Sequence, residues 1–253
     1  MDIQTSLNYL EQLHLPAPRL TRSALQSTRN AAPLQADTVD SAAGIQDNKL
    51  ITFTSNLDTK YKEVVKYSTQ IAQRAANAKH DMLTERMDWY NTYIETLRHA
   101  GWIGSDNKLT EYHGADLDVT MESVALELIQ LAAGPNAALL LEITNAAIST
   151  LKGDNELSLK LQKASVRGKS GTFDILPCLQ RDDDVVMYDH SMVFEHSTTS
   201  GSFLFWDWSL KEVDLQHVAN EWTLNYSHYQ QVEAGIKKAL GESSNSFFEN
   251  IKL

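Results

Sequence analysis

Apolar residues recur every three or four positions over residues 57–76 and again over residues 82–97. This spacing puts them on one side of a helix, so it predicts two amphipathic helices, the first of about six turns and the second over residues 81–99. Gly101 follows the second helix directly, at the position where glycine commonly ends a helix. A shorter pattern of the same kind predicts a helix over residues 2–14.

Residues 119–151 have the pattern of a helical hairpin, with two Ala- and Leu-rich segments on either side of Gly134-Pro135. Glycine suits the end of one helix and proline the first turn of the next. Three glutamates interrupt the apolar surface: Glu122, Glu127 and Glu142. A charge at bilayer depth costs roughly 3 kcal/mol, and each arm is shorter than the roughly 20 residues of a spanning helix. We interpret the segment as a buried core hairpin; a membrane-inserting hairpin is the alternative.

From Leu157 onward the apolar residues alternate with polar ones, which is typical of strands. The pattern predicts strands over residues 157–161, 172–179, 186–196, 203–210 and 213–224, the last four joined by short polar turns. A final amphipathic pattern predicts a helix over residues 226–240. The expected fold class is therefore α+β, with an N-terminal helical layer packed on a C-terminal antiparallel β-meander and a closing helix.

The N-terminal part of the chain has a different composition. Residues 16–48 hold three of the five prolines among Ala, Ser, Thr, Gln and Asp, without a stable apolar period. We expect residues 1–49 to form a mobile arm with a short helix, and residues 50–253 to form a single α+β domain. The start of the chain shows no basic leader and no apolar run. Synthesis in the cytoplasm without a cleavable signal peptide is expected, with later export or membrane association left open.

The charge balance excludes one class of partner. The net charge is −11 and the charged residues are predominantly acidic, whereas a nucleic-acid surface needs clustered Lys and Arg. We therefore expect no nucleic-acid partner.

Cys178 is the single cysteine of the chain and lies in a predicted strand. It is either a buried, inert thiol or a site of acylation. Apolar side chains of its own strand and of the following ones are candidates for a lipid pocket or core around it: Leu176, Met192, Phe194, Leu204 and Trp206.

Patterns for other chemistry are weak. His190 and His196 lie on one face of a predicted strand, but six residues span about 20 Å, too far for one metal ion. Asp182-Asp183-Asp184 lacks the glycine and downstream glutamate of a calcium loop. Without a G-x-S-x-G motif or a Gly-rich phosphate loop, we expect no metal, no cofactor and no catalytic residues. A cysteine-dependent hydrolase or acyltransferase using Cys178 is an alternative.

Five stretches together resemble the Evf-like bacterial virulence factors and related bacterial and fungal proteins. They are residues 69–76, residues 88–97 with Gly101-Trp102, the strand containing Cys178, residues 203–206 and residues 224–229. The resemblance implies an α+β fold and S-palmitoylation of the matching cysteine, which is Cys178, so a covalent fatty acid is expected there.

The resemblance also implies a non-enzymatic virulence or host-interaction factor. Its expected partner is a host protein, a protein of a toxin system, or membrane lipid. The alternative from the residues themselves is a component of a membrane-active toxin system, pore-forming or insecticidal, that uses the hairpin of residues 119–151.

Overall fold

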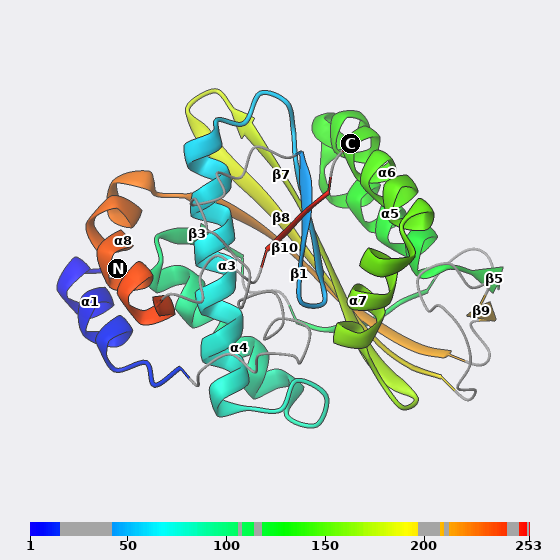
Figure 1. Cartoon of the computed structure of the whole chain (residues 1–253), viewed down its shortest axis with the longest axis horizontal. Helices are drawn as coiled ribbons and strands as arrows, with labels where there is room; N and C mark the ends of the chain where they lie inside the picture. Colours follow the sequence, from blue (N-terminus) through cyan, green and yellow to red (C-terminus); the bar gives the residue numbers. More distant parts are fainter. Residues whose placement is uncertain are drawn as a thin grey trace, which may run out of the picture. The chain divides into compact units, whose positions relative to one another are not determined.

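A computed structural model shows helices and strands in the order drawn in Figure 1. It describes residues 1–15, 42–105, 108–113, 118–196, 208–209, 213–241, 248–251 and 253. The α+β class expected from the sequence is confirmed.

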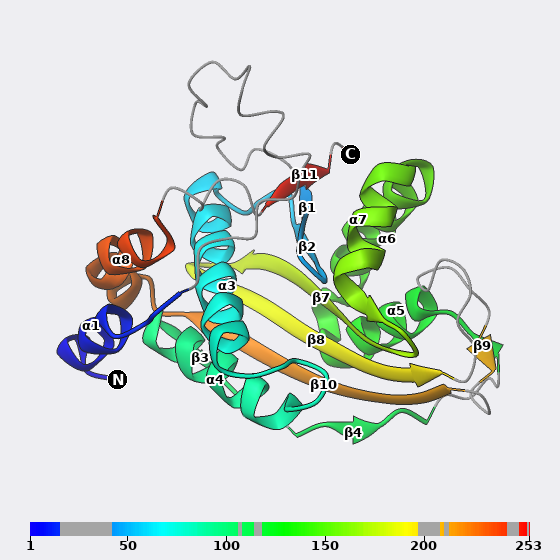
Figure 2. The same cartoon turned by 60° about the horizontal axis from the view of Figure 1, so that its bottom comes forward.

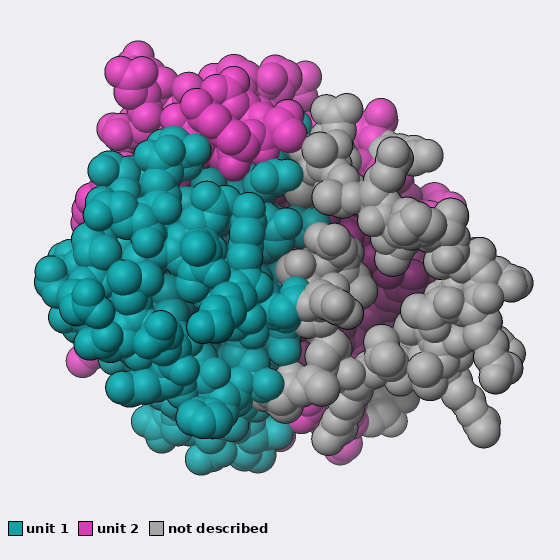
Figure 3. Space-filling model, turned by 60° about the vertical axis from the view of Figure 1, so that its left-hand side comes forward, with its two compact units in different colours: residues 1–40, 62–101, 226–247 teal, residues 41–61, 102–225, 248–253 magenta. Residues whose placement is uncertain are grey.

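The chain divides into two compact units, each built from several stretches of the sequence and coloured separately in Figure 3. Unit 1 comprises Met1–Asp40, Lys62–Gly101 and Tyr226–Phe247, and unit 2 comprises Ser41–Tyr61, Trp102–Asn225 and Phe248–Leu253. A single domain over residues 50–253 stays a prediction.

Unit 1 is helical. Its helices are α1 (Ile3–Glu11), most of α3 (Thr59–Lys79), α4 (Arg86–His99) and α8 (Tyr226–Leu240). The Asp2 side chain caps α1 by accepting a hydrogen bond from the backbone N–H of Thr5, at 3.1 Å. Tyr9 stacks on His99 of α4, with ring centroids 4.0 Å apart. The ring stacking packs the short N-terminal helix against α4. The helices expected near both ends of the chain are confirmed as α1 and α8.

Unit 2 is built on a sheet of mixed direction. The strands follow the order β11-β1-β2-β7-β8-β10-β3, and β2 and β7 are parallel while the other neighbours are antiparallel. Their bounds are β1 Ala43–Gln46, β2 Lys49–Phe53, β3 Trp102–Gly104, β7 Ser170–Arg181, β8 Asp184–His196, β10 Val213–Leu224 and β11 Glu249–Ile251. The short strands are β4 Thr110–Glu111 on β10, β6 Val166–Arg167 on β7, and the separate pair β5 Asp118–Val119 and β9 Trp208–Ser209.

Helices α5 (Met121–Ala132), α6 (Ala137–Gly153) and α7 (Asn155–Ser165) lie on one face of this sheet (Figure 2). A single 3-10 turn, Gly134–Asn136, joins α5 to α6. The hairpin expected over residues 119–151 is thus confirmed. Its inward side chains, among them Leu128 and Leu140, join Phe173 and Phe194 of the sheet in one buried apolar core.

The segment 157–161, expected as a strand, is part of α7 instead. The Asp154 side chain accepts hydrogen bonds from the backbone N–H groups of Glu156 and Leu157, which starts a helix at this point. Leu161 is buried but Leu159 is 48% exposed, so the alternation of leucines does not mark one buried face. The strand prediction was wrong because Leu157 and Leu161, four residues apart, also share one face of a helix.

The boundary predicted for the N-terminal arm, residue 49, is too late in the sequence, because strand β1 already begins at Ala43. Strands β1 and β2 form a hairpin whose turn is Asp47-Asn48, with Asp47 at φ 51°. Aspartate and asparagine tolerate this left-handed conformation, which two-residue hairpin turns require. Residues 203–207 of a further predicted strand lie outside the described residues.

Truncating the hairpin core should destabilise the protein strongly. We expect Leu128→Ala and Leu140→Ala each to lower the free energy of unfolding by about 2–5 kcal/mol, because each leaves a cavity in a packed apolar layer. Chemical denaturation measures the change. Leu139→Ala is the matched control, because Leu139 is 43% exposed beside Leu140. An equal loss for Leu139 and Leu140 would contradict the packing described.

Candidate functional site

Cys178 lies in the C-terminal half of β7 and is completely buried. Burial, and to a smaller extent the nearby Asp189 carboxylate, raises the pKa of its thiol well above the ordinary value. Its Sγ lies 3.5 Å from the backbone oxygen of Leu176. The thiol is therefore protonated at neutral pH, which makes it a poor nucleophile in this state.

The strand register determines which side chains share a face with Cys178. Cys178 pairs with Met187 of β8 and with Phe53 of β2, and Leu176 lies two residues along the same strand. Successive side chains of a strand point to opposite faces, so these residues lie on one face of the sheet. Of the candidates expected around the cysteine, Leu176 is therefore placed beside it.

Two other candidates are placed elsewhere. Met192 and Phe194 pair with Phe173 and Gly171, and they belong to the core beneath α5, α6 and α7. They face away from Cys178 because their strand positions differ from that of Met187 by an odd number of residues. The expectation that they neighbour Cys178 is corrected by this register. Leu204 and Trp206 lie outside the described residues.

A buried polar cluster occupies the same sheet face as Cys178. Lys49 of β2 pairs with Asp174 of β7 across the parallel ladder, and its ammonium group contacts one carboxylate oxygen of Asp174. The hydroxyl of Ser191 on β8 donates to the other oxygen. Both charged side chains are buried, so the pair and its hydrogen bonds offset the cost of removing two charges from water.

Asp189 is a second buried carboxylate on this face, next to the pair. Neither of its oxygens has a hydrogen-bond partner among the described residues. Burial raises the pKa of Asp189 to about 7, against the opposing effect of the Lys49 cation and with a further increase from Asp174. Asp189 thus gains or loses its proton near neutral pH, unlike an ordinary aspartate.

Among the described residues, the histidines do not gather into a metal site. His190 points to the opposite face from Asp189, and burial, together with His217, lowers the pKa of His190 to about 4. In the described part of the chain, no three His, Cys, Asp or Glu side chains are grouped so that they could hold a metal ion.

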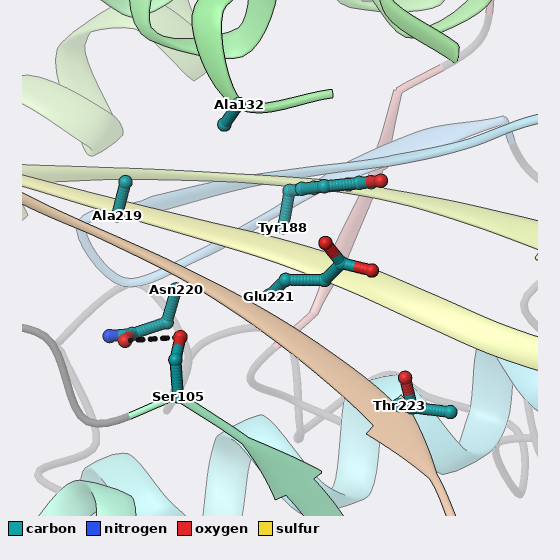
Figure 4. Close-up of a pocket in the computed structure, with 7 residues that line it drawn as sticks. All are labelled: Ser105, Ala132, Tyr188, Ala219, Asn220, Glu221 and Thr223. Atoms are coloured by element: carbon teal, nitrogen blue, oxygen red, sulfur yellow. Dashed lines mark hydrogen bonds between the residues drawn. The ribbon is translucent and has the colours of Figure 1, made fainter. Parts of the chain in front are cut away.

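A polar pocket of about 400 Å³ opens where the helical layer ends above β8 and β10 (Figure 4). Tyr188 and Glu221 are directly paired across these two strands and both line it, but Tyr188 is 3% exposed and belongs to the apolar core, whereas the Glu221 side chain is 45% exposed. Ala219 and Thr223 line it from the same strand as Glu221, and Ala132 lines it from the end of α5. At its margin the Ser105 hydroxyl donates to the side-chain oxygen of Asn220, at 3.1 Å.

The sequence analysis missed this pocket. Its signal is the spacing of Ala219, Glu221 and Thr223, which puts a carboxylate and a hydroxyl on one sheet face. The signal can be interpreted only when the pairing of β10 with β8 is known, because this pairing decides which side chains lie together.

The tip of the α5–α6 hairpin is an exposed apolar surface. Leu131 is 74% exposed and Leu139 is 43% exposed, on either side of the turn at Gly134-Pro135. We call Leu131–Leu139 the hairpin tip. The sequence from Leu128 to Leu141 contains no charged residue, so the tip offers leucine, alanine and proline side chains to its surroundings.

The comparisons with known proteins give weak structural likenesses. Neither the protein-family models nor the curated proteins match the chain. The structure is similar to that of the Evf virulence factor, with 15% identity, a TM-score of 0.39, and coverage of 99% of this chain and 91% of that one. It is also similar to a delta-endotoxin, with 13% identity, a TM-score of 0.45, and coverage of 83% and 90%. Likenesses at this level carry no argument about this chain.

Proposed function

We propose that this protein is a non-enzymatic, membrane-active protein that docks on lipid through the tip of the α5–α6 hairpin. The observation that carries the proposal is the exposed pair Leu131 and Leu139 in a stretch without charges. Large apolar side chains grouped on an exposed turn mark surfaces that contact a partner or a membrane. The apolar tip between two amphipathic helices suits shallow insertion at a membrane interface.

Two of the three hairpin carboxylates have partners away from its tip. Glu122 near the start of α5 pairs with Lys152 near the end of α6, at the base of the hairpin. Glu127 accepts a hydrogen bond from the hydroxyl of Tyr112. These two carboxylates therefore have partners away from the tip. Glu142, three residues after Leu139 on α6, is exposed, so only shallow entry of the tip leaves this carboxylate in water.

The expected depth of insertion is shallow. Among the helices that the structure describes, none is long and apolar enough to cross a membrane. Burying a leucine fully is worth roughly 1.5–3 kcal/mol, so the exposed parts of Leu131 and Leu139 contribute on the order of 2 kcal/mol on entering lipid. This gives only weak, reversible contact, less than a single acyl chain provides, so the alanine and proline side chains of the tip must add to it.

Charging the tip should abolish the docking. We expect Leu131→Glu to reduce binding to uncharged phosphatidylcholine vesicles by more than about tenfold, because a carboxylate must then be dehydrated at the interface. Flotation of protein with vesicles measures bound and free fractions. Uncharged vesicles remove the repulsion that the net charge of −11 would add on anionic lipid.

Leu159→Glu is the matched control. Leu159 is 48% exposed on α7, outside the hairpin, and the substitution adds the same charge. It should leave vesicle binding unchanged. An equal loss of vesicle binding for both variants, or no loss for Leu131→Glu, would contradict the proposal.

The virulence role, the partner, the acylation of Cys178 and the enzymatic alternative expected from the sequence stay predictions. A virulence or host-interaction role, and a partner in a host or toxin system, fit a membrane-docking protein but need biological assays. A fatty acid on Cys178 would appear in the mass of the intact protein. A cysteine-dependent hydrolase or acyltransferase would require Cys178 to become accessible, since it is buried in the folded structure.

A further inference from the structure

We propose that the buried side chains of Lys49 and Asp174 join in a covalent amide bond, with loss of one water molecule, once the protein has folded. This pair is then a self-modification site that ties β2 to β7. Three features occur together there: the two groups are in contact, both are buried, and a second buried carboxylate, that of Asp189, lies beside them. The bond does not require membrane docking, so it can be tested separately.

The strands hold the two reacting groups against each other. Lys49 and Asp174 are direct partners in the parallel ladder of β2 and β7, and the Lys49 ammonium contacts one carboxylate oxygen of Asp174. The hydroxyl of Ser191 donates to the other oxygen, which keeps the carboxylate in this orientation. Groups held in contact in this way react as if they were very concentrated, with effective molarities of roughly 10⁵ M or more.

Burial makes the reactive, neutral form of the pair accessible. The side chains of Lys49 and Asp174 are 1% and 2% exposed. Charges removed from water are costly, so moving one proton from the ammonium to the carboxylate is less unfavourable here than at the surface. The transfer gives a neutral amine, which is a nucleophile, and a neutral acid, which can lose water. Because this form is a minor population of the ion pair, the bond forms slowly.

Asp189 is placed to carry the protons that the reaction moves. It lies two residues from Ser191 on the same face of β8, close enough to Lys49 and Asp174 for both to affect its pKa. Neither of its oxygens has a hydrogen-bond partner among the described residues. Burial raises the pKa of Asp189 to about 7, so this side chain is protonated in mildly acidic solution. An acid with a pKa near the working pH is suited to giving and taking protons.

The reaction balances without any further reactant. The neutral Nζ of Lys49 attacks Cγ of Asp174, and the Ser191 hydroxyl stabilises the negative charge on the oxygen that it already binds. Protonated Asp189 gives its proton to the departing oxygen, and its carboxylate then takes a proton from Nζ. The new N–C bond replaces a C–O bond, water leaves, and Asp189 ends protonated as it began.

The bond closes a covalent loop between Lys49 and Asp174, which are 125 positions apart. Closing so long a loop restricts the unfolded chain, as a disulfide over the same distance does. Chains that still have their full mass contain the ion pair instead. The unfolding free energies of Lys49 and Asp189 variants are therefore compared with unlinked wild-type chains.

Intact-protein mass spectrometry of the full chain tests the bond. After incubation of the folded protein at about pH 6, we expect its mass to be lower than the sequence mass by one water molecule. Tryptic digestion and tandem mass spectrometry should find the peptide of Lys49 joined to that of Asp174, because trypsin does not cut after an acylated lysine. The same incubation in concentrated urea should leave the full mass, because the two groups are then far apart.

Variants locate the reaction. Lys49→Met and Asp174→Leu should each keep the full mass of their sequence. Lys152→Met is the control and should still lose water, because Lys152 pairs with Glu122 where the two side chains are 45% and 21% exposed. If the first two variants fail to fold, the linked peptide of the wild-type protein decides. Full mass after prolonged incubation of folded wild-type protein, or water loss mapped to other residues, would overturn the proposal.

The pH dependence of the reaction tests the part of Asp189. Its rate should fall about tenfold between about pH 6 and about pH 8, because Asp189 loses its proton as pH rises through about 7. The other titratable groups beside Asp189 on this sheet face are Lys49, Asp174 and Cys178, and burial keeps the Cys178 thiol protonated by raising its pKa. From β10 the direct partner of Asp189 is Asn220, which does not titrate.

Asp189→Asn separates proton transfer from packing, because asparagine has the same shape and no proton to exchange in this range. It should slow the loss of water at about pH 6 by about a hundredfold or more and remove the pH dependence. Asp182→Asn, in the exposed β7–β8 turn, should change neither. Equal rates and parallel pH profiles for wild type and Asp189→Asn would overturn the role given to Asp189.

Discussion

Replacing Lys49 with methionine is expected to lower the free energy of unfolding by about 3–5 kcal/mol. The reason is that Lys49 is the buried cation beside Asp174, and Asp189 adds a second buried carboxylate on the same face. Removing the cation leaves Asp174 without its ionic partner in a region away from water. Urea denaturation at neutral pH measures the loss.

Two further variants isolate the cause. Lys49→Met combined with Asp174→Leu should be less destabilised than Lys49→Met alone, because no unpaired charge is then left behind. Lys160→Met removes a surface pair with Glu249, in which Lys160 is 46% exposed, and should cost less than about 1 kcal/mol. If Lys49→Met and Lys160→Met had equal costs, the buried pair would not have the role described.

Replacing Asp189 with asparagine is expected to stabilise the protein at alkaline pH and to remove most of its loss of stability between about pH 4 and pH 8. The pKa of Asp189 is raised from 3.8 to about 7, first by burial, with Lys49 opposing and Asp174 adding to the shift. Protonated Asp189 therefore contributes fully to stability below the pKa that it has in the unfolded protein. This contribution is lost as pH rises through the higher pKa that it has in the folded protein. The wild-type protein should lose roughly 4 kcal/mol across this range through Asp189.

The informative quantity is the difference between variant and wild type at two pH values, because all other titrating groups then cancel. Urea denaturation at about pH 4 and about pH 8 should show a stability difference that grows with pH in favour of Asp189→Asn. Asp182→Asn, in the β7–β8 turn, is the control and should leave the pH profile unchanged. Parallel profiles for wild type and Asp189→Asn would show that Asp189 is ionised normally.

The local patterns of the sequence predicted much of the secondary structure. The strand Val213–Leu224 and the helix Tyr226–Leu240 match their expected bounds, since each has an uninterrupted period and a clear stop signal. The hairpin was predictable from Gly134-Pro135 for the same reason. The prediction failed at residues 157–161, where the leucines satisfy the strand period but Leu157 and Leu161 also satisfy the helix period. The side-chain cap at Asp154 favours the helix.

The arrangement of the site was beyond the reach of local patterns. Lys49 and Asp174 are 125 residues apart and meet because β2 pairs with β7 in parallel. The β1–β2 hairpin was predictable in principle, since Asp47-Asn48 separates two short apolar runs. The register between β7 and β8 decides which sheet face Cys178, Met192 and Phe194 share or do not share. That register depends on pairing between residues far apart in the sequence. Which apolar side chains of the hairpin stay exposed also depends on how its helices pack on the sheet.

The central claim is that the hairpin tip enters the membrane interface, and a polarity-sensitive dye at position 131 tests it most directly. Leu131→Cys can be labelled in the native protein, because Cys178 is buried and burial raises its thiol pKa. On addition of phosphatidylcholine vesicles, the dye at position 131 should brighten and shift to the blue, and the same dye on Leu159→Cys should not. A protein that binds vesicles while the dye at position 131 stays in water would contradict the account.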